Sequence, residues 1–517
     1  MAPRHSAVGQ TSWPSAPKWS AIAPRADIER VLPFAPVDLM RVWQPRLPLG
    51  IFSLTSNPAA LAWEAAPTHS DYAVEQRGQR GDYRRPLDAA QSSEILLGAS
   101  GATRMGANGG VLGGITEEND RLSPGARVDQ SQPFGSSPLV LADTTASPMS
   151  ATAVDIVGAG GWSLGPFAAG ISGAYDTQSL HTDRAGFVRQ TQITTPGLTL
   201  GVAVRAGTPL HLVLGAHTGT QRQSQTTNFL ELTEQGLLYQ LQGFRDASLI
   251  QVKQSYYQRF DERTNFVGGA LAGDVIGARW LLGIEGATRH DLTTHAEASA
   301  ALMDRWRTNG TTVTAGVERT IESATIRAVV RSTAVSGALQ MSSDSLGPSL
   351  TSRERASFGQ LEVLTPIGAR TALLVSAAVL DERLTRADTL EGVLLDLNWR
   401  DPVVGATVSY RLSSRVAVLL GLAGGWHNAA GHIPRATDRD VAYRTFIAPE
   451  IAIYASPATA TSAQLGFAYQ LTGTLRATLT GQRASVGPTG FAYISERPSG
   501  SREMTSIRFS MSFSPGQ

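Results

Sequence analysis

The sequence predicts an all-β fold: an antiparallel transmembrane β-barrel of about 18–22 strands that follows a non-barrel N-terminal segment. Three observations support this prediction. Apolar and polar residues alternate with a period of two after residue 65, and the alternating segments are about 9 to 13 residues long. Short turns also alternate with long polar connections. We therefore expect two regions, an N-terminal leader or lumen plug over residues 1–65 and a barrel over residues 66–517.

The composition excludes several functional classes before any motif is considered. The 517-residue chain contains no cysteine, which rules out disulfide scaffolds, thiolate zinc sites and cysteine nucleophiles. Its formal net charge is only +1, whereas nucleic-acid-binding domains usually carry a strongly basic face. The longest apolar runs have about ten residues, too few for a helical membrane span but enough for a tilted strand. We therefore expect no nucleic-acid partner.

Alternation is clear in several segments of the chain. Residues 198–204 and 404–412 place apolar side chains at every second position, with small or polar residues between them. Residues 393–399 show the same pattern, and residues 400–402 are interpreted as a turn before the next strand. A membrane barrel directs the apolar face to lipid and the polar face to the lumen, whereas a soluble sandwich buries the apolar face. Alternation alone does not distinguish the two.

Strand length and loop asymmetry favour the membrane barrel. Globular strands usually have about 5 or 6 residues, whereas a tilted strand needs about 9 to 11 to cross a bilayer. Bacterial outer-membrane barrels have short turns on one side and long loops on the other, so we expect this chain in the outer membrane of a Gram-negative bacterium. The expected short turns are 163–166, 206–209, 273–276 and 365–370. The expected long loops are 118–149, 178–196, 220–235, 334–355 and 485–502.

The C-terminal strand carries a second indication of this location. Ile507, Phe509, Met511 and Phe513 alternate with polar residues, and this pattern resembles the outer-membrane assembly signal. The resemblance implies the barrel-assembly machinery and outer-membrane lipid as partners. The four-residue tail 514–517 is a departure, since that signal usually ends on the aromatic residue itself.

Aromatic residues near strand ends have two interpretations. In a membrane barrel they form an interfacial girdle, and in a sandwich they cap the core. The girdle is the favoured interpretation for four residues, Trp162, Trp399, Trp426 and Tyr454.

The N-terminal region, residues 1–65, does not show the series of alternating strands that predicts the barrel. Residues 1–50 lack the continuous apolar segment of a secretory signal, and we expect residues 1–65 to form a leader or to lie in the lumen. The segment 56–61 contains Asn-Pro-Ala and is similar to an element near the start of long-chain fatty-acid transporter barrels.

A longer series of motifs supports a second resemblance. Residues 81–86, 138–145 and 161–165 occur in an order that resembles an uncharacterised outer-membrane β-barrel family with a domain-of-unknown-function label. The motifs cover about the first third of the expected barrel. This resemblance implies the fold and the compartment but no activity.

The candidate functional residues are the charged residues that strand parity places in the lumen. Their mixed charge indicates either a selective polar pore or a network of ion pairs that fills the interior. Arginine predominates, because only two of the 44 basic residues are lysines. The candidates are Arg279, Glu285, Glu318, Arg327, Arg331, Glu362, Asp396, Arg400, Arg411, Arg444, Glu450, Arg476 and Arg508.

No motif predicts catalysis, a metal site or a cofactor. The segment 161–165 matches the Gly-x-Ser-x-Gly nucleophile elbow, but an alternating strand follows it instead of the required helix. The nine histidines lack the spacing of a metal motif. The leading hypothesis is therefore passage or binding of a small solute in a polar, arginine-lined lumen. A structural or adhesion scaffold with long loops is the second hypothesis, and an outer-membrane hydrolase that uses Ser163 is the third.

Overall fold

The computed structural model describes most of the chain from Asn57 to Ser514. The described residues are 57–64, 68–84, 89–123, 139–143, 147–182, 187–206, 211–232, 236–242, 248–252, 257–297, 300–340, 348–388, 392–432, 443–490 and 499–514.

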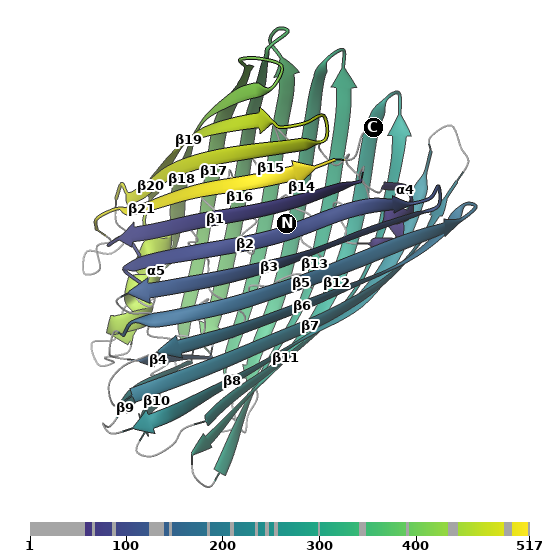
Figure 1. Cartoon of the computed structure of the whole chain (residues 1–517). Coiled ribbons are helices and arrows are strands. Elements are labelled where there is room, and N and C mark those ends of the chain that lie inside the picture. The colour runs from purple at the N-terminus through teal and green to yellow at the C-terminus, as the bar shows by residue number, and fades with distance from the viewer. Residues whose placement is uncertain are drawn as a thin grey trace.

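Eighteen antiparallel strands form one closed barrel (Figure 1). Consecutive barrel strands are hydrogen-bonded neighbours, and the last strand pairs with the first. The barrel strands are β1 (His69–Gly81), β2 (Gln91–Met105), β3 (Gly109–Ser123), β5 (Met149–Leu164), β6 (Phe167–Thr182), β7 (Phe187–Arg205), β8 (Val213–Leu232), β11 (Tyr257–Val275), β12 (Ala278–Glu297), β13 (Ala300–Ile321), β14 (Ala324–Gln340), β15 (Leu350–Pro366), β16 (Thr371–Asp388), β17 (Val393–Arg411), β18 (Val416–His432), β19 (Ala458–Gln470), β20 (Leu475–Pro488) and β21 (Arg502–Phe513).

Closure occurs between β1 and β21, where Ser70 lies opposite Phe513 and Gly81 lies opposite Arg502. The final apolar residues of the chain, predicted as an assembly signal, therefore lie in the closing strand, with Ile507, Phe509 and Phe513 exposed on the outer surface. The barrel and its number of strands confirm the predicted fold class. Within the described ranges, no helix has the length and hydropathy of a membrane span.

An apolar belt covers the outer surface near the short turns. On β7 the side chains of Leu198, Leu200 and Val202 are exposed, and the outer residues farther from the turn, such as Gln192, are polar. The strands have 12 to 22 residues, more than the about 9 to 11 needed to cross a bilayer. The belt therefore occupies the half of each strand near the short turns, and the other half extends beyond the membrane. Of the four predicted short turns, 163–166, 273–276 and 365–370 lie at the belt end, although residues 273–275 belong to β11, and 206–209 falls largely outside the described residues.

A small sheet forms outside the barrel, at the end opposite the short turns. Its strands are β4 (Leu139–Asp143), β9 (Gly236–Gln242) and β10 (Ser248–Val252), with β9 in the middle. The first belongs to the connection between β3 and β5, and the other two belong to the connection between β8 and β11. Two long connections are therefore joined by main-chain hydrogen bonds.

The strand β17 corrects the prediction of a turn at 400–402. It runs without interruption through these residues, and the register with β18 is the same on both sides of Pro402. The apolar residues change from the inner face, at Leu397 and Trp399, to the outer face, at Val404. This change of face occurs because the outward half of β17 packs against an inserted helix while the other half contacts lipid. In the sequence, this change of face looks the same as a break between two strands, and this similarity explains the incorrect prediction of a turn.

The inserted helix is α5 (Ala448–Ala455), which follows η2 (Tyr443–Ile447) in the connection between β18 and β19. One apolar cluster joins Ile451 and Tyr454 of α5 to inner residues of β13 to β17, and a second joins Ile453 to β19, β20 and Tyr83. The rings of Trp399 and Tyr454 stack with centroids 6.3 Å apart. These two aromatics therefore belong to an inner core instead of the predicted girdle, whereas Trp162 and Trp426 are exposed on the outer surface.

A buried histidine fixes α5 to the wall. The ring of His427 on β18 lies 2.7 Å from Asp401 through Nδ1 and 2.7 Å from the carbonyl oxygen of Tyr454 through Nε2. Both partners are acceptors, so His427 must donate from both nitrogens, which requires the imidazolium form. Its charge is compensated by the Asp401 carboxylate in a site where both side chains are buried.

The segment 57–64 lies against the opposite part of the inner wall. It contains η1 (Pro58–Ala60) and α4 (Leu61–Glu64), and Asn57 caps η1 by accepting a hydrogen bond from the Ala59 amide. The amide nitrogen of Asn57 donates to the carbonyl oxygens of Val202 and Ala216, each at 3.2 Å. This arrangement anchors the start of the segment to β7 and β8.

Glycines on three neighbouring strands make room for this segment. Gly161, Gly170 and Gly201 are direct register partners on β5, β6 and β7. A Cβ atom on any of them would overlap Asn57, Pro58 or Ala59, mostly at backbone atoms that cannot move aside. Close approach of another backbone is one reason for glycine within a strand.

We expect His427→Leu to destabilise the barrel, because it leaves the buried Asp401 carboxylate without its cation. Removal of one member of a buried pair costs about 3–5 kcal/mol. Urea titration in detergent, followed by tryptophan fluorescence, measures the free energy of unfolding. His181→Leu, at an exposed site on β6, is the matched control and should have little effect. Equal stabilities of the two variants would contradict the role of His427.

We expect Gly170→Ala to displace the segment 57–64, because the new methyl group would overlap its backbone. The chain has no cysteine, so a single Ala59→Cys substitution reports the exposure of the segment through its rate of reaction with a maleimide. Labelling should be faster in the Gly170→Ala background than in a Gly158→Ala background, where a Cβ meets nothing within 4 Å. Identical labelling rates would show that the glycine contact does not hold the segment.

Candidate functional site

A row of charged side chains of alternating sign crosses the inner wall from β11 to β15. Its members lie directly opposite one another in adjacent strands and on the inward face of each strand. Opposite charges in directly opposed positions attract across a sheet, by roughly 0.2–1 kcal/mol for each pair. In order, the row consists of Asp274, Arg279, Glu318, Arg327 and Glu362.

The row continues as small and polar side chains on the next four strands. Glu362 is followed by Ser376, Gly405, Ala423 and Ser462 on β16 to β19. Barrel strands are tilted relative to the barrel axis, so a row of direct register partners shifts along this axis from strand to strand. Arg279 is the second residue of β12 at the short-turn end, whereas Ser462 lies near the outward end of β19. The row therefore links the two ends of the lumen.

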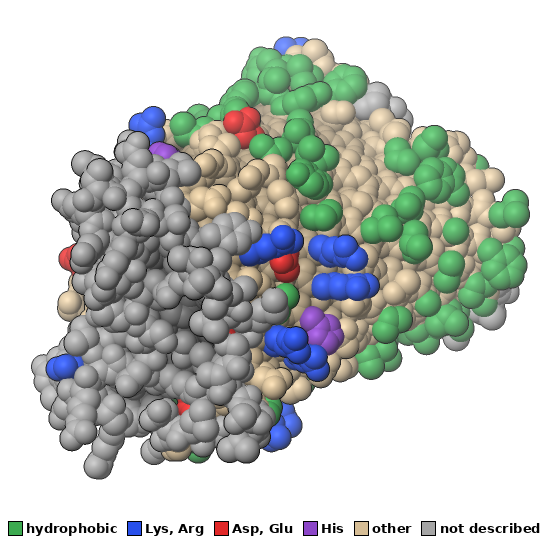
Figure 2. Space-filling view, turned by 90° about the horizontal axis from the view of Figure 1, so that it is seen from below, with side chains coloured by type: hydrophobic (Ala, Val, Ile, Leu, Met, Phe, Trp, Pro, Cys, Tyr) green, Lys and Arg blue, Asp and Glu red, His purple; other side chains and the backbone are tan. Residues whose placement is uncertain are grey.

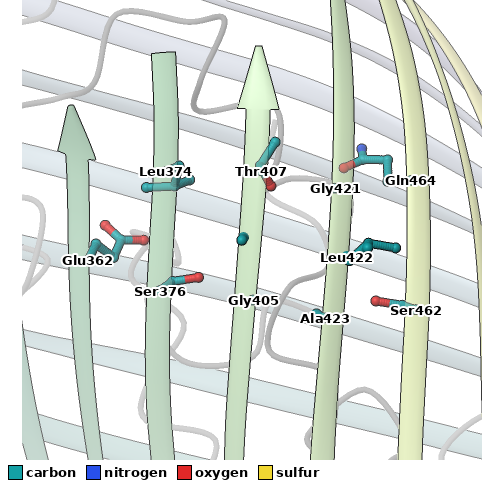
Figure 3. A pocket seen from close by; sticks show the side chains of 11 residues that line it. Glu362, Leu374, Ser376, Gly405, Thr407, Gly421, Leu422, Ala423, Ser462 and Gln464 are labelled. Atoms are coloured by element: carbon teal, nitrogen blue, oxygen red, sulfur yellow. The ribbon is translucent and has the colours of Figure 1, made fainter. Parts of the chain in front are cut away.

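A hollow in the wall lies where the charged part of the row ends (Figure 3). Gly405 and Gly421 contribute no side chains, and a small space, part of it open to solvent, remains between the strands. Five polar side chains border this space from β15, β16, β17 and β19. They are Glu362, Ser376, Thr407, Ser462 and Gln464.

The amide of Gln464 distinguishes this hollow from the rest of the wall. The residue is 3% exposed, and neither its oxygen nor its nitrogen has a hydrogen-bond partner among the described residues. A buried amide without partners costs about 1–3 kcal/mol. Glu362 accepts a hydrogen bond from Gln360 at 3.0 Å. The hollow thus offers one carboxylate, three hydroxyls and an amide that provides both a donor and an acceptor.

A second polar cluster lies beside the segment 57–64. Nε2 of His217 on β8 is 2.8 Å from Oε2 of Glu285 on β12, and the two side chains meet over Gly268 of the intervening strand. His217 is also the direct register partner of Gly201, which touches Asn57. Arg331 donates to Thr314 at 3.3 Å and interacts electrostatically with Glu285. This cluster therefore connects the inserted segment with the charged wall.

A third cluster lies at the closure of the barrel. Arg77 on β1 bonds to Glu75 at 2.8 Å and to Glu94 of β2 at 3.0 Å. Arg508 of the last strand lies 3.6 Å from Glu75. The closing strands are thus joined by inward-facing ion pairs as well as by main-chain hydrogen bonds.

Nine of the charged residues selected by parity lie on the inward face of barrel strands. Four belong to the charged row, two to the cluster around His217 and one to the closure, and the last two lie at the short-turn end of the lumen. In that order they are Arg279, Glu318, Arg327, Glu362, Glu285, Arg331, Arg508, Arg411 and Arg476.

The structure places the other four candidates elsewhere. Asp396 and Arg400 lie on the outer face of β17 and form ion pairs with Arg383 and Asp381, at 2.8 and 2.7 Å. Their parity was misassigned because the apolar residues of this half of β17 face inward. Arg444 is exposed on η2, and Glu450 lies on α5, so neither belongs to a barrel strand. The side chain of Glu450 is outside the described residues.

Several inward-facing polar residues were not predicted from the sequence. Asp274 was assigned to a turn, although it belongs to β11 and starts the charged row. His217 and Gln464 alternate with apolar residues of their own strands, so parity indicates their polar faces, but their surroundings come from strands distant in sequence. Parity also indicates Glu75 and Glu94, which alternate with apolar residues on the first two strands.

The segment 161–165 does not form a nucleophile elbow. Ser163 lies at the end of β5, its hydroxyl donates to the carbonyl oxygen of Asn108 at 3.2 Å, and a two-residue turn leads into β6. The strand–turn–helix context that exposes a catalytic serine is absent from this described segment.

The fold is similar to that of solved outer-membrane proteins at very low sequence identity. The ferric preacinetobactin receptor BauA from Acinetobacter baumannii is 8% identical, with 88% of this chain and 84% of that chain covered and a TM-score of 0.37. The copper transporter OprC is 11% identical, with 86% and 80% covered and a TM-score of 0.43. A FadL homologue from Pseudomonas aeruginosa is 12% identical, with 89% and 93% covered and a TM-score of 0.31.

No curated protein matches this chain significantly. A family-level match covers residues 58–513, which include the whole barrel and the inserted segment from Pro58 onward. The predicted resemblance to an uncharacterised barrel family is confirmed. The chain belongs to a family of unknown function, DUF6850.

Proposed function

We propose that this outer-membrane β-barrel allows a small polar solute to pass through its lumen, and that the hollow bordered by Glu362 and Gln464 binds the solute during passage. The observation that carries this proposal is the charged row, which leads from the short-turn end of the lumen to the hollow. Barrels of 16 to 18 strands are wide enough to enclose a water-filled channel.

The chemistry of the hollow favours a solute with both donors and acceptors. The Gln464 amide presents one of each, and no described protein group satisfies them. A solute that bonds to this amide would compensate for its burial. Glu362 and Arg327, at the end of the charged row, favour a solute that is zwitterionic or strongly dipolar over an apolar one.

The segment 57–64 contacts β3 and β5 to β8, and its residue Leu61 also packs across the lumen against Leu281 of β12 and Val329 of β14. These two wall residues are each two positions from a member of the charged row, so the segment lies beside the first part of the row. The helix α5 packs against the outward half of the wall that carries the hollow. In this proposal α5 restricts access from outside, and the charged row provides the path toward the short turns.

We expect Glu362→Gln to shift the ion selectivity of the channel toward anions, because it removes one negative charge from the lumen. The reversal potential of single channels in a planar bilayer, under a potassium chloride gradient, measures this shift. Glu503→Gln, at the outward end of β21 where Glu503 pairs with Arg80 and Arg483, is a control with the same charge change. A wild-type protein without conductance or solute uptake would contradict passage altogether.

We expect Gln464→Leu to slow the uptake of hydrogen-bonding solutes into liposomes, by roughly 2- to 10-fold if one or two hydrogen bonds are lost. Swelling assays with neutral, cationic, anionic and zwitterionic solutes of similar size identify the class that is affected. Gln192→Leu changes the same residue type at an exposed position on the outer face of β7 and should leave uptake unchanged. Equal uptake by both variants would remove the hollow from the path.

A scaffold function is supported by a separate feature, the sheet formed by β4, β9 and β10. Main-chain pairing between two long connections creates a defined surface beyond the membrane. If this surface binds other cells or proteins, deletion of residues 236–252 should abolish that binding and leave conductance intact. Unchanged binding would count against the scaffold.

A further inference from the structure

A row of basic side chains crosses the outer surface of the barrel on four adjacent strands. Arg222 on β8 lies directly opposite Arg263 on β11, which lies opposite His290 on β12, which lies opposite Arg307 on β13. All four side chains are exposed. Figure 2 shows basic side chains gathered beside a histidine at the border of the hydrophobic surface. We call these four residues the outer basic row.

The outer basic row lies beyond the apolar belt, four to eight residues along each strand from the exposed apolar side chains of the belt. Leu214, Val267, Ile284 and Val313 are exposed on the same faces of the same four strands, nearer to the short turns. The row therefore stands at the level where the headgroups of the outer leaflet meet the protein, if the long connections face outward as in bacterial barrels. Adjacent strands are about 4.8 Å apart, so the four residues span roughly 14 Å.

The residues of the row have no ion-pair partner among the described residues, whereas some other outer arginines do. Arg259, Arg383 and Arg400 each form an ion pair with an aspartate on the outer surface, at 2.6 to 2.8 Å. No ion pair or hydrogen bond joins a side chain of the row to another described residue. The nearest acid on the same face of β11 is Asp261, which already accepts hydrogen bonds from Arg259 and Ser224.

Like charges directly opposite one another destabilise a sheet unless an anion lies between them. Arg222 and Arg263 form such a pair, and Arg307 extends the positive surface beyond His290. Guanidinium groups bind phosphate through two parallel hydrogen bonds, and this geometry makes arginine the preferred residue for phosphate recognition. A phosphate at the membrane surface would satisfy these side chains without removing them from their strands.

We propose that the outer basic row binds the phosphorylated headgroup of a lipid in the outer leaflet of the membrane. The acyl chains of this lipid lie along the apolar belt below the row, and its phosphate groups lie between the guanidinium groups. This site is on the lipid side of the wall, so it is independent of solute passage through the lumen.

Native mass spectrometry of the full chain in detergent measures the proposed binding, with bisphosphorylated lipid A as the probe. The variant Arg222→Gln/Arg263→Gln/Arg307→Gln should bind it at least about tenfold more weakly, because charge-assisted hydrogen bonds are lost. The matched control is Arg80→Gln/Arg383→Gln/Arg400→Gln, which removes three arginines that are ion-paired with acids on the barrel. This control should retain the affinity of the wild type.

Further arms of the experiment separate the phosphate from the lipid. Lipid A with one phosphate removed should bind more weakly than the bisphosphorylated form, and inorganic phosphate alone should not compete at equal concentration. Equal weakening in both triple variants would indicate general attraction by net charge and overturn the proposal, as would a wild-type protein that binds no lipid A. The heat-dependent mobility of each variant on a gel shows that its barrel is closed, and Arg263→Gln alone provides a milder variant.

Discussion

Closure of the sheet between β1 and β21 is the constraint on which the rest of this molecule depends. Water is absent from the bilayer interior, so every main-chain amide and carbonyl group there must be paired within the protein. Eighteen strands satisfy this requirement by returning to the first strand. The ion pairs of Arg77 and Arg508 with Glu75 strengthen the same seam from the inner side. A closed sheet then leaves only its two faces and its two ends available for function.

Along the strands, apolar side chains change from the outer face to the inner face of the sheet, because the surroundings of the barrel change at the membrane surface. Near the short turns lipid contacts the outer face, and apolar residues such as Val404 lie there. Farther out, water contacts the outer face, where Asp381 and Arg400 form an ion pair, while Leu397 and Trp399 cover α5 from inside. The outward half of the barrel is therefore built like a soluble domain with an apolar core.

Small residues and buried charges decide where the inserted segments lie. Gly161, Gly170 and Gly201 allow a second backbone to approach the wall, and the Asn57 side chain completes the contact. At the other end the imidazolium of His427 joins Asp401 to the backbone of α5. The charged row and the hollow lie between these two anchors, and Leu61 packs beside the first part of the row, against Leu281 and Val329. The proposed path for a solute follows from this division of the inner wall.

The sequence alone predicts the barrel, because alternation, strand length and short turns are local properties that the bilayer imposes on each strand. It also placed Arg279, Glu318, Arg327 and Glu362 on one face, since parity is local as well. Only the tertiary structure could show that these four residues stand directly opposite one another, because register depends on pairing between strands. The tertiary structure also shows that Asp396 and Arg400 lie on the outer face, since the apolar residues of β17 contact lipid in one half of the strand and α5 in the other.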